Sequence, residues 1–116
     1  MDRVLILAEQ LGKELAKHGA VQKFLARQKE LSSDAAAQEI LDHYEKQVQK
    51  IADLERQGKP IETDDKHALA DLQTQLSANP AVKNFMAAQV EYSDLLRKIN
   101  QQVMAPLHAA EQGSDT

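Results

Sequence analysis

Cysteine is absent from this chain of 116 residues. Without a thiol, the chain cannot form disulfides, thiolate metal sites or cysteine-ligated iron–sulfur clusters of its own. Nothing in the composition indicates an oxidising compartment. The sequence therefore excludes thiol chemistry as a basis for function.

Aromatic residues and excess positive charge are also scarce. Phe, Trp and Tyr make up 3% of the chain, and 14 Lys and Arg stand against 18 Asp and Glu, for a net charge of -4. Stacking of exposed bases needs aromatic side chains, and binding to phosphates or anionic lipids needs a basic surface. The sequence therefore predicts no direct nucleic-acid binding and no binding to anionic membranes.

Long hydrophobic runs are missing as well. The chain begins MDRVLILAEQ, where a short apolar run is followed at once by charged residues, with no small-residue cleavage site. No segment has the approximately 18 consecutive apolar residues of a membrane-spanning helix. We therefore expect a cytoplasmic protein without a signal peptide or membrane insertion.

Glycine and proline are few, at four and three, whereas Ala and Gln number 17 and 13. This composition favours helix, and no segment alternates apolar and polar residues long enough to form a strand. The sequence predicts an all-α fold: an elongated antiparallel helical hairpin or bundle of about five helices, two of them long. A single domain, residues 1–107, should bury roughly two-thirds of its unfolded surface.

Turn and capping residues divide the chain into helices at about 2–17, 20–31, 33–57, 64–77 and 80–104. Gly19 is predicted to end the first helix in a left-handed conformation, and Gly58 to end the third. Ser33 and Thr63 are predicted N-caps, and Asn79 caps a helix whose first residue is a proline.

The last predicted helix should stop just beyond Met104, because Pro106 lacks the N–H that continues a helix. The sequence after it, AAEQGSDT, is too polar to pack. We predict that residues 108–116 form a disordered C-terminal tail.

An apolar stripe with one polar member runs along residues 79–103 in steps of three and four. This spacing keeps a seam facing one partner helix, either within the chain's own core or in another copy. A polar Gln89 within such a seam can fix register and copy number. These residues form the predicted oligomer interface: Val82, Phe85, Gln89, Tyr92, Leu96, Ile99 and Val103.

Histidines and carboxylates at helical spacing provide the one pattern that resembles a metal site. The alternative function is therefore a metal-binding helical-bundle enzyme, with five candidate ligands: Glu39, Asp42, His43, Asp64 and His67. The Glu-x-x-His motif of di-iron bundles does not occur, and no nucleophile motif or phosphate-binding loop is present. The preferred interpretation is a non-enzyme with no catalytic residues, no metal and no cofactor.

Three stretches resemble a bacterial family of small helical regulators, the YlbF/YmcA/YheA group. They are DAAAQEILDHYEKQVQKI, QGKPIE and LADLQTQLSANPAVKNFMAAQVEYSDLLRKINQQV. The similarity lies in the order and spacing of an Ala-Gln helix start, a Gly-x-x-Ile turn, an Asn-Pro-x-Val-x-x-Phe start and a Leu-Leu-x-x-Ile close. The ending INQQVMAPL looks most like the YheA branch.

The resemblance implies an all-α protein that forms homo-oligomers and acts without catalysis. Some relatives work with partner proteins on a membrane-anchored endoribonuclease and affect RNA processing, competence, sporulation and biofilm formation. The relatives that form that complex carry cysteines linked to iron–sulfur binding, which this chain lacks. We expect a regulatory or adaptor protein whose partners are itself, as a homodimer or higher oligomer, and an unidentified protein.

Overall fold

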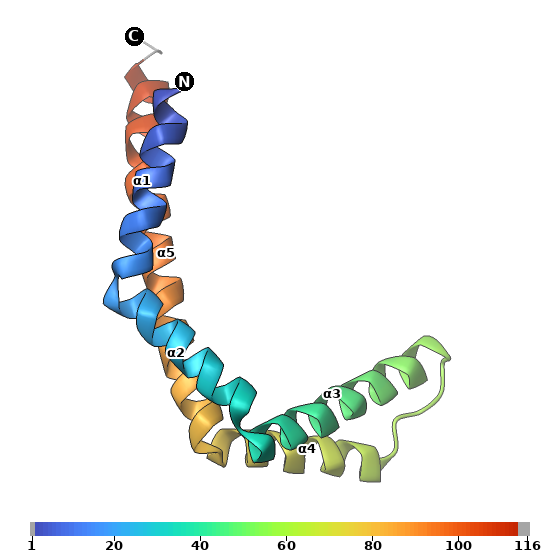
Figure 1. Cartoon of the computed structure of the whole chain (residues 1–116). Helices are drawn as coiled ribbons and strands as arrows, with labels where there is room; N and C mark the ends of the chain where they lie inside the picture. Colours follow the sequence, from blue (N-terminus) through green and yellow to red (C-terminus); the bar gives the residue numbers. More distant parts are fainter. Residues whose placement is uncertain (1, 114–116) are drawn as a thin grey trace. The chain divides into compact units, whose positions relative to one another are not determined.

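The computed structural model describes residues 2–113 and confirms the all-α prediction (Figure 1). Within these residues there are five α-helices and no strand. The longest are α3 and α5, with 22 and 34 residues. The helices are α1 (Arg3–Lys17), α2 (Gly19–Ser33), α3 (Ala35–Arg56), α4 (Thr63–Ala78) and α5 (Pro80–Gly113).

The chain divides into two compact units. The terminal unit contains residues up to Leu25 and from Ala87 onward, and the central unit contains residues 26–86. In the terminal unit, α1 runs antiparallel beside α5, so that the Arg3 end of α1 lies with the Gly113 end of α5 (Figure 1).

The first turns of α2 also belong to the terminal unit and pack on α5. The rings of Phe24 and Tyr92 are stacked with their centroids 4.5 Å apart. One residue earlier on each helix, Lys23 forms an ion pair with Glu91 at 3.7 Å. Aromatic stacking and the neighbouring ion pair therefore join these two helices.

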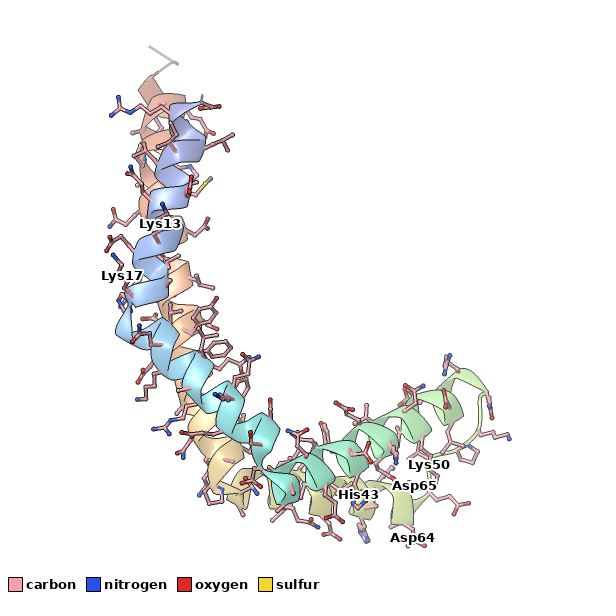
Figure 2. The ribbon with its side chains drawn as sticks, viewed as in Figure 1. Lys13, Lys17, His43, Lys50, Asp64 and Asp65 are labelled. Atoms are coloured by element: carbon pink, nitrogen blue, oxygen red, sulfur yellow. The ribbon has the colours of Figure 1, made fainter. Side chains whose placement is uncertain are left out.

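The central unit is built on an antiparallel hairpin of α3 and α4. Gly58 ends the helical path after α3 with a φ of +69°, a conformation that glycine adopts at little cost, which confirms its predicted role. Across the hairpin, Lys50 Nζ lies 2.8 Å from Asp65 Oδ1, and the Gln47 amide donates to the Asp65 carbonyl at 2.9 Å (Figure 2).

Two predicted helix boundaries are wrong because a neighbouring residue caps the helix instead. Gly19 is not left-handed; it begins α2, and His18 Nδ1 accepts a hydrogen bond from the Ala20 N–H at 3.0 Å. Asp34 replaces Ser33 as the cap of α3, since its carboxylate accepts from the Ala37 N–H at 2.8 Å.

Helix α4 has no side-chain cap at all. Its N-cap position is Glu62, which makes no capping hydrogen bond, and Thr63 is already the first helical residue. Asn79 is confirmed as a cap, because the Val82 N–H donates to Asn79 Oδ1 at 3.1 Å. The Asn-Pro pair thus starts α5 as predicted.

The predicted end of α5 near Met104 is wrong, because the helix continues through Pro106 to Gly113. A proline inside a helix removes one hydrogen bond, yet Ala105, Leu107 and the alanines after them favour helix strongly enough to extend it. Residues 108–113 are helical and exposed, and residues 114–116 lie outside the described residues. The assignment of 1–107 as one domain remains a prediction.

The buried core of the isolated chain is small. Among the described residues only Ala37, Val82 and Ala88 are buried, and no helix there has an apolar stretch long enough to cross a membrane. Large hydrophobic side chains are exposed on several helices, among them Val4 and Val90, each 70% exposed. Much apolar surface therefore has no cover from the chain itself.

Candidate interaction surface

The predicted seam on α5 divides between residues covered by the chain and residues that are open to solvent. Val82 is 5% exposed, and Phe85, Tyr92 and Ile99 are half-buried. Gln89, Leu96 and Val103 are exposed. Val82 and Phe85 lie in the central unit, whereas the other five lie in the terminal unit.

Val82 and Phe85 contribute to a hollow inside the central unit, of about 340 Å³. The hollow lies between α3, α4, the end of α2 and the start of α5. Its lining residues are mainly apolar: Leu31, Leu41, Tyr44, Gln73, Leu76, Ser77, Val82, Phe85 and Met86. This part of the seam therefore packs against the chain's own helices.

The exposed part of the seam continues onto α1, which the sequence-based interface prediction did not include. Val4, Leu7 and Leu11 follow one another at helical spacing and are 70%, 51% and 39% exposed. Their spacing marks an amphipathic helix, but it does not say whether α5 would cover them. We call the following set the terminal apolar face: Val4, Leu7 and Leu11 of α1 with Leu96, Val103 and Leu107 of α5.

A second hollow of about 340 Å³ lies within this face and joins its two helices. It is lined by Leu11 from α1 and by Lys98, Ile99, Gln102 and Val103 from α5. Aliphatic side chains dominate, while Lys98 and Gln102 supply the polar groups. The hollow can accept an apolar side chain, with polar groups at its edge to set the orientation of a bound helix.

The charged groups around this face pair mainly within their own helices. On α1, Lys13 pairs with Glu9 at 3.5 Å and Lys17 with Glu14 at 4.0 Å; both lysines are more than two-thirds exposed (Figure 2). These local pairs leave α1 without a strong charge of one sign facing a partner.

On α5, Asp94 accepts from both Lys98 and Arg97, with Lys98 Nζ 2.9 Å away. The hydrogen bond from Lys98, followed by that from Arg97, holds the pKa of the Asp94 carboxyl below its usual range. Asp94 therefore pairs with Lys98, whose side chain also lines the hollow. The charges at this edge of the apolar face are therefore paired within α5.

The residues of the metal-site alternative are not brought together. Asp42 forms an ion pair with Lys46 at 2.9 Å, and His43 and Asp64 are exposed on α3 and α4 (Figure 2). Across the described residues 2–113, no group of three His, Asp or Glu side chains could hold a metal ion. Helical spacing on α3 and α4 did not produce a ligand set, because the candidate side chains of the two helices do not converge on one point.

Comparisons with known sequences identify relatives of similar length. A UPF0342 protein of Streptococcus pyogenes serotype M4 is 26% identical over 100 residues, covering 86% of this chain and 88% of the relative. A UPF0342 protein of Desulfitobacterium hafniense strain Y51 is 23% identical over 93 residues, covering 80% of this chain and 71% of the relative.

Two solved structures share the fold. A chain in the crystal structure of Bacillus subtilis RicA in complex with RicF matches with a TM-score of 0.84 at 20% identity, covering 93% of this chain and 96% of the matched chain. A protein of unknown function from Bacillus stearothermophilus (DUF964) matches with a TM-score of 0.67 at 17% identity, covering 92% of this chain and 94% of the matched chain. The family described as "Control of competence regulator ComK, YlbF/YmcA" matches residues 4–108. The chain therefore belongs to the YlbF/YmcA family.

Proposed function

We propose that this chain is a non-catalytic regulatory or adaptor protein of the cytoplasm that works by binding other proteins through its helices. We further propose that it forms a homodimer through the terminal apolar face. The single observation behind this proposal is the exposure of that face on a chain with only three buried residues among those described. Monomeric proteins rarely leave so much contiguous apolar surface open to water.

The terminal apolar face is open to solvent along its length. Its six residues are each between 39% and 70% exposed. A standard protein interface covers roughly 800 Å² on each partner. A homodimer can therefore bury the terminal apolar face and still leave surface for another protein.

Family membership supports the regulatory part of the proposal. The family's description names control of the competence regulator ComK, and RicA was solved in complex with another protein, RicF. By analogy, we propose that this chain also binds a protein of different sequence, in processes such as competence, RNA processing, sporulation or biofilm formation. The absence of cysteine means that it contributes no thiolate ligand to such a complex.

Sedimentation velocity over a range of concentrations tests the homodimer, with a matched pair of leucine substitutions on α1. Leu7→Glu places a charge within the terminal apolar face, whereas Leu5→Glu places it two residues away, on another side of the helix. We expect the native chain and Leu5→Glu to sediment as dimers and Leu7→Glu as a helical monomer, because burying an unpaired carboxylate is unfavourable.

The adaptor role is tested by affinity capture from the native host with the same three proteins. A partner retained by the native chain and Leu5→Glu would support the role. A native chain that is monomeric at every concentration would refute the homodimer, and a chain that captures no specific protein would refute the adaptor role.

A further inference from the structure

Pro106 creates an unusual acceptor at the edge of the terminal apolar face. In a helix, the carbonyl of residue 102 accepts from the N–H of residue 106, but α5 has a proline there and continues as helix on both sides. The Gln102 carbonyl therefore lacks its usual donor. Water can supply one in the free chain, but not once a partner covers the face.

Gln102, the residue that carries this carbonyl, lines the hollow of the terminal unit. Ile99, Gln102 and Val103 line the hollow, and Pro106 follows Ile99 and Gln102 by seven and four residues, on the same side of the helix. The Gln102 side chain is exposed and lines the same hollow. One residue thus presents an amide donor and a backbone acceptor in an apolar setting.

We propose that Gln102 is the residue that fixes the register of a homodimer, by donating its side-chain amide to the Gln102 carbonyl of a second copy. This inference rests on the proposed homodimer. In a two-fold contact, a residue near the axis meets its own counterpart, so each copy gives and receives one hydrogen bond. A docked apolar surface without a donor would leave both carbonyls buried and unsatisfied.

A second copy fits the observations better than an oppositely charged protein. The donor and acceptor are complementary to themselves, and the charges next to the hollow already pair within their own helix, as Lys98 does with Asp94. Gln89, the residue that the sequence pattern favoured for this role, is exposed but does not line the hollow.

The absence of cysteine makes the test direct, because a single introduced thiol is the only one in the chain. Gln102→Cys, Gln101→Cys and Gln89→Cys are treated with a short bis-maleimide after their dimers are confirmed by sedimentation. We expect most of the Gln102→Cys chain to become covalent dimer. Residue 101 is adjacent but lies on another side of the helix, so Gln101→Cys should form little covalent dimer.

Substitutions at the donor and at the proline provide a second readout. Gln102→Leu should raise the dimer dissociation constant on the order of ten-fold or more, since two symmetric hydrogen bonds are lost. In a Pro106→Ala background the carbonyl regains a donor from its own helix, so Gln102→Leu should have a much smaller effect. Circular dichroism verifies that each variant remains helical.

The outcomes separate the two proposals. A native chain that never dimerises refutes the homodimer itself. If the native chain dimerises but Gln102→Cys does not crosslink, crosslinks no better than Gln101→Cys, or crosslinks less than Gln89→Cys, then the register assignment is wrong. An equal effect of Gln102→Leu with and without Pro106 would also refute the role of the freed carbonyl.

Discussion

Asn79 shows how one side chain sets the start of a helix. Its Oδ1 accepts from the Val82 N–H at 3.1 Å, one of the N–H groups that has no partner within α5. Asn79→Ala should therefore lower the free energy of unfolding by about 1 kcal/mol, measured by urea denaturation. Asn79→Asp is the control, because it keeps an acceptor at the same place. If Asn79→Asp lowered the free energy of unfolding as much as Asn79→Ala does, the capping hydrogen bond would not be the cause of the loss.

The ion pair between Lys50 and Asp65 makes stability depend on pH. The hydrogen bond from Lys50 holds the pKa of Asp65 below 3.8, and the bond to Asp65 raises the pKa of Lys50 above 10.5. Because the Asp65 pKa is lowered, the ionised carboxylate stabilises the fold above about pH 3.8. This stabilisation is lost as the pH falls through the pKa of Asp65 in the folded chain. Because the Lys50 pKa is raised, the charged amine stabilises the fold below about pH 10.5. This stabilisation is lost as the pH rises through the pKa of Lys50 in the folded chain.

Asp65→Asn should therefore be less stable than the native chain across neutral pH, with the difference shrinking toward strong acid and strong base. Urea midpoints measured from acid to alkaline pH give the profile. Asp64→Asn, the exposed neighbour in the first turn of α4, serves as the control. A gap between Asp65→Asn and the native chain that does not change with pH would contradict the ion-pair explanation.

Individual capping residues could be predicted only where a single candidate was present. Asn79 and Gly58 stand alone at their boundaries and were identified correctly. Ser33 and Asp34 are both good caps, and the sequence does not say where the chain turns, so the carboxylate that reaches the Ala37 N–H was missed. His18 is a less common cap, and no propensity argument identified it.

At the scale of elements, α5 shows how neighbouring residues can overcome a helix breaker. Pro106 predicted an end near Met104, but the helix extends to Gly113 through residues with strong helix preference. The cost of one missing hydrogen bond is local, whereas helix propensity acts over the whole segment. The sequence identified the helix and its start, and it failed only at the end.

The last turns of α5 should be dispensable. Residues 109–113 are exposed in the structure, so deleting residues 109–116 should leave the melting temperature and the assembly size unchanged. A longer deletion, of residues 107–116, also removes Leu107 from the terminal apolar face and should weaken association. Thermal melting and sedimentation measure both effects. A large loss from the shorter deletion would show that the end of α5 packs on something.

At the scale of the whole molecule, the period of the α5 stripe was predicted but its orientation was not. Ala88 is fully buried, whereas its neighbour Gln89 in the predicted seam is exposed. Steps of three and four residues fit either position, and the choice depends on where α1 and α2 lie against α5. For the same reason, the spacing of Val4, Leu7 and Leu11 did not indicate that α5 would leave them uncovered.

Leu96 allows the two original interpretations of the stripe to be separated. It is 39% exposed, so a carboxylate there can reach water in the free chain but not beneath a second copy. Leu96→Glu should therefore give a soluble monomer with native helicity. Val90→Glu is the matched control, because Val90 is 70% exposed and lies on the opposite side of α5 from Ile99, about two and a half turns away.

Light scattering and circular dichroism distinguish the outcomes for Leu96→Glu. If the stripe were only a monomer core, the variant would unfold at every concentration, since the charge would have no route to solvent even in a single chain. If Leu96 lay outside any contact, the variant would keep both its helicity and its assembly size, as Val90→Glu should. A helical monomer is expected only from an interface between copies, because only that arrangement makes the cost of the buried charge depend on association.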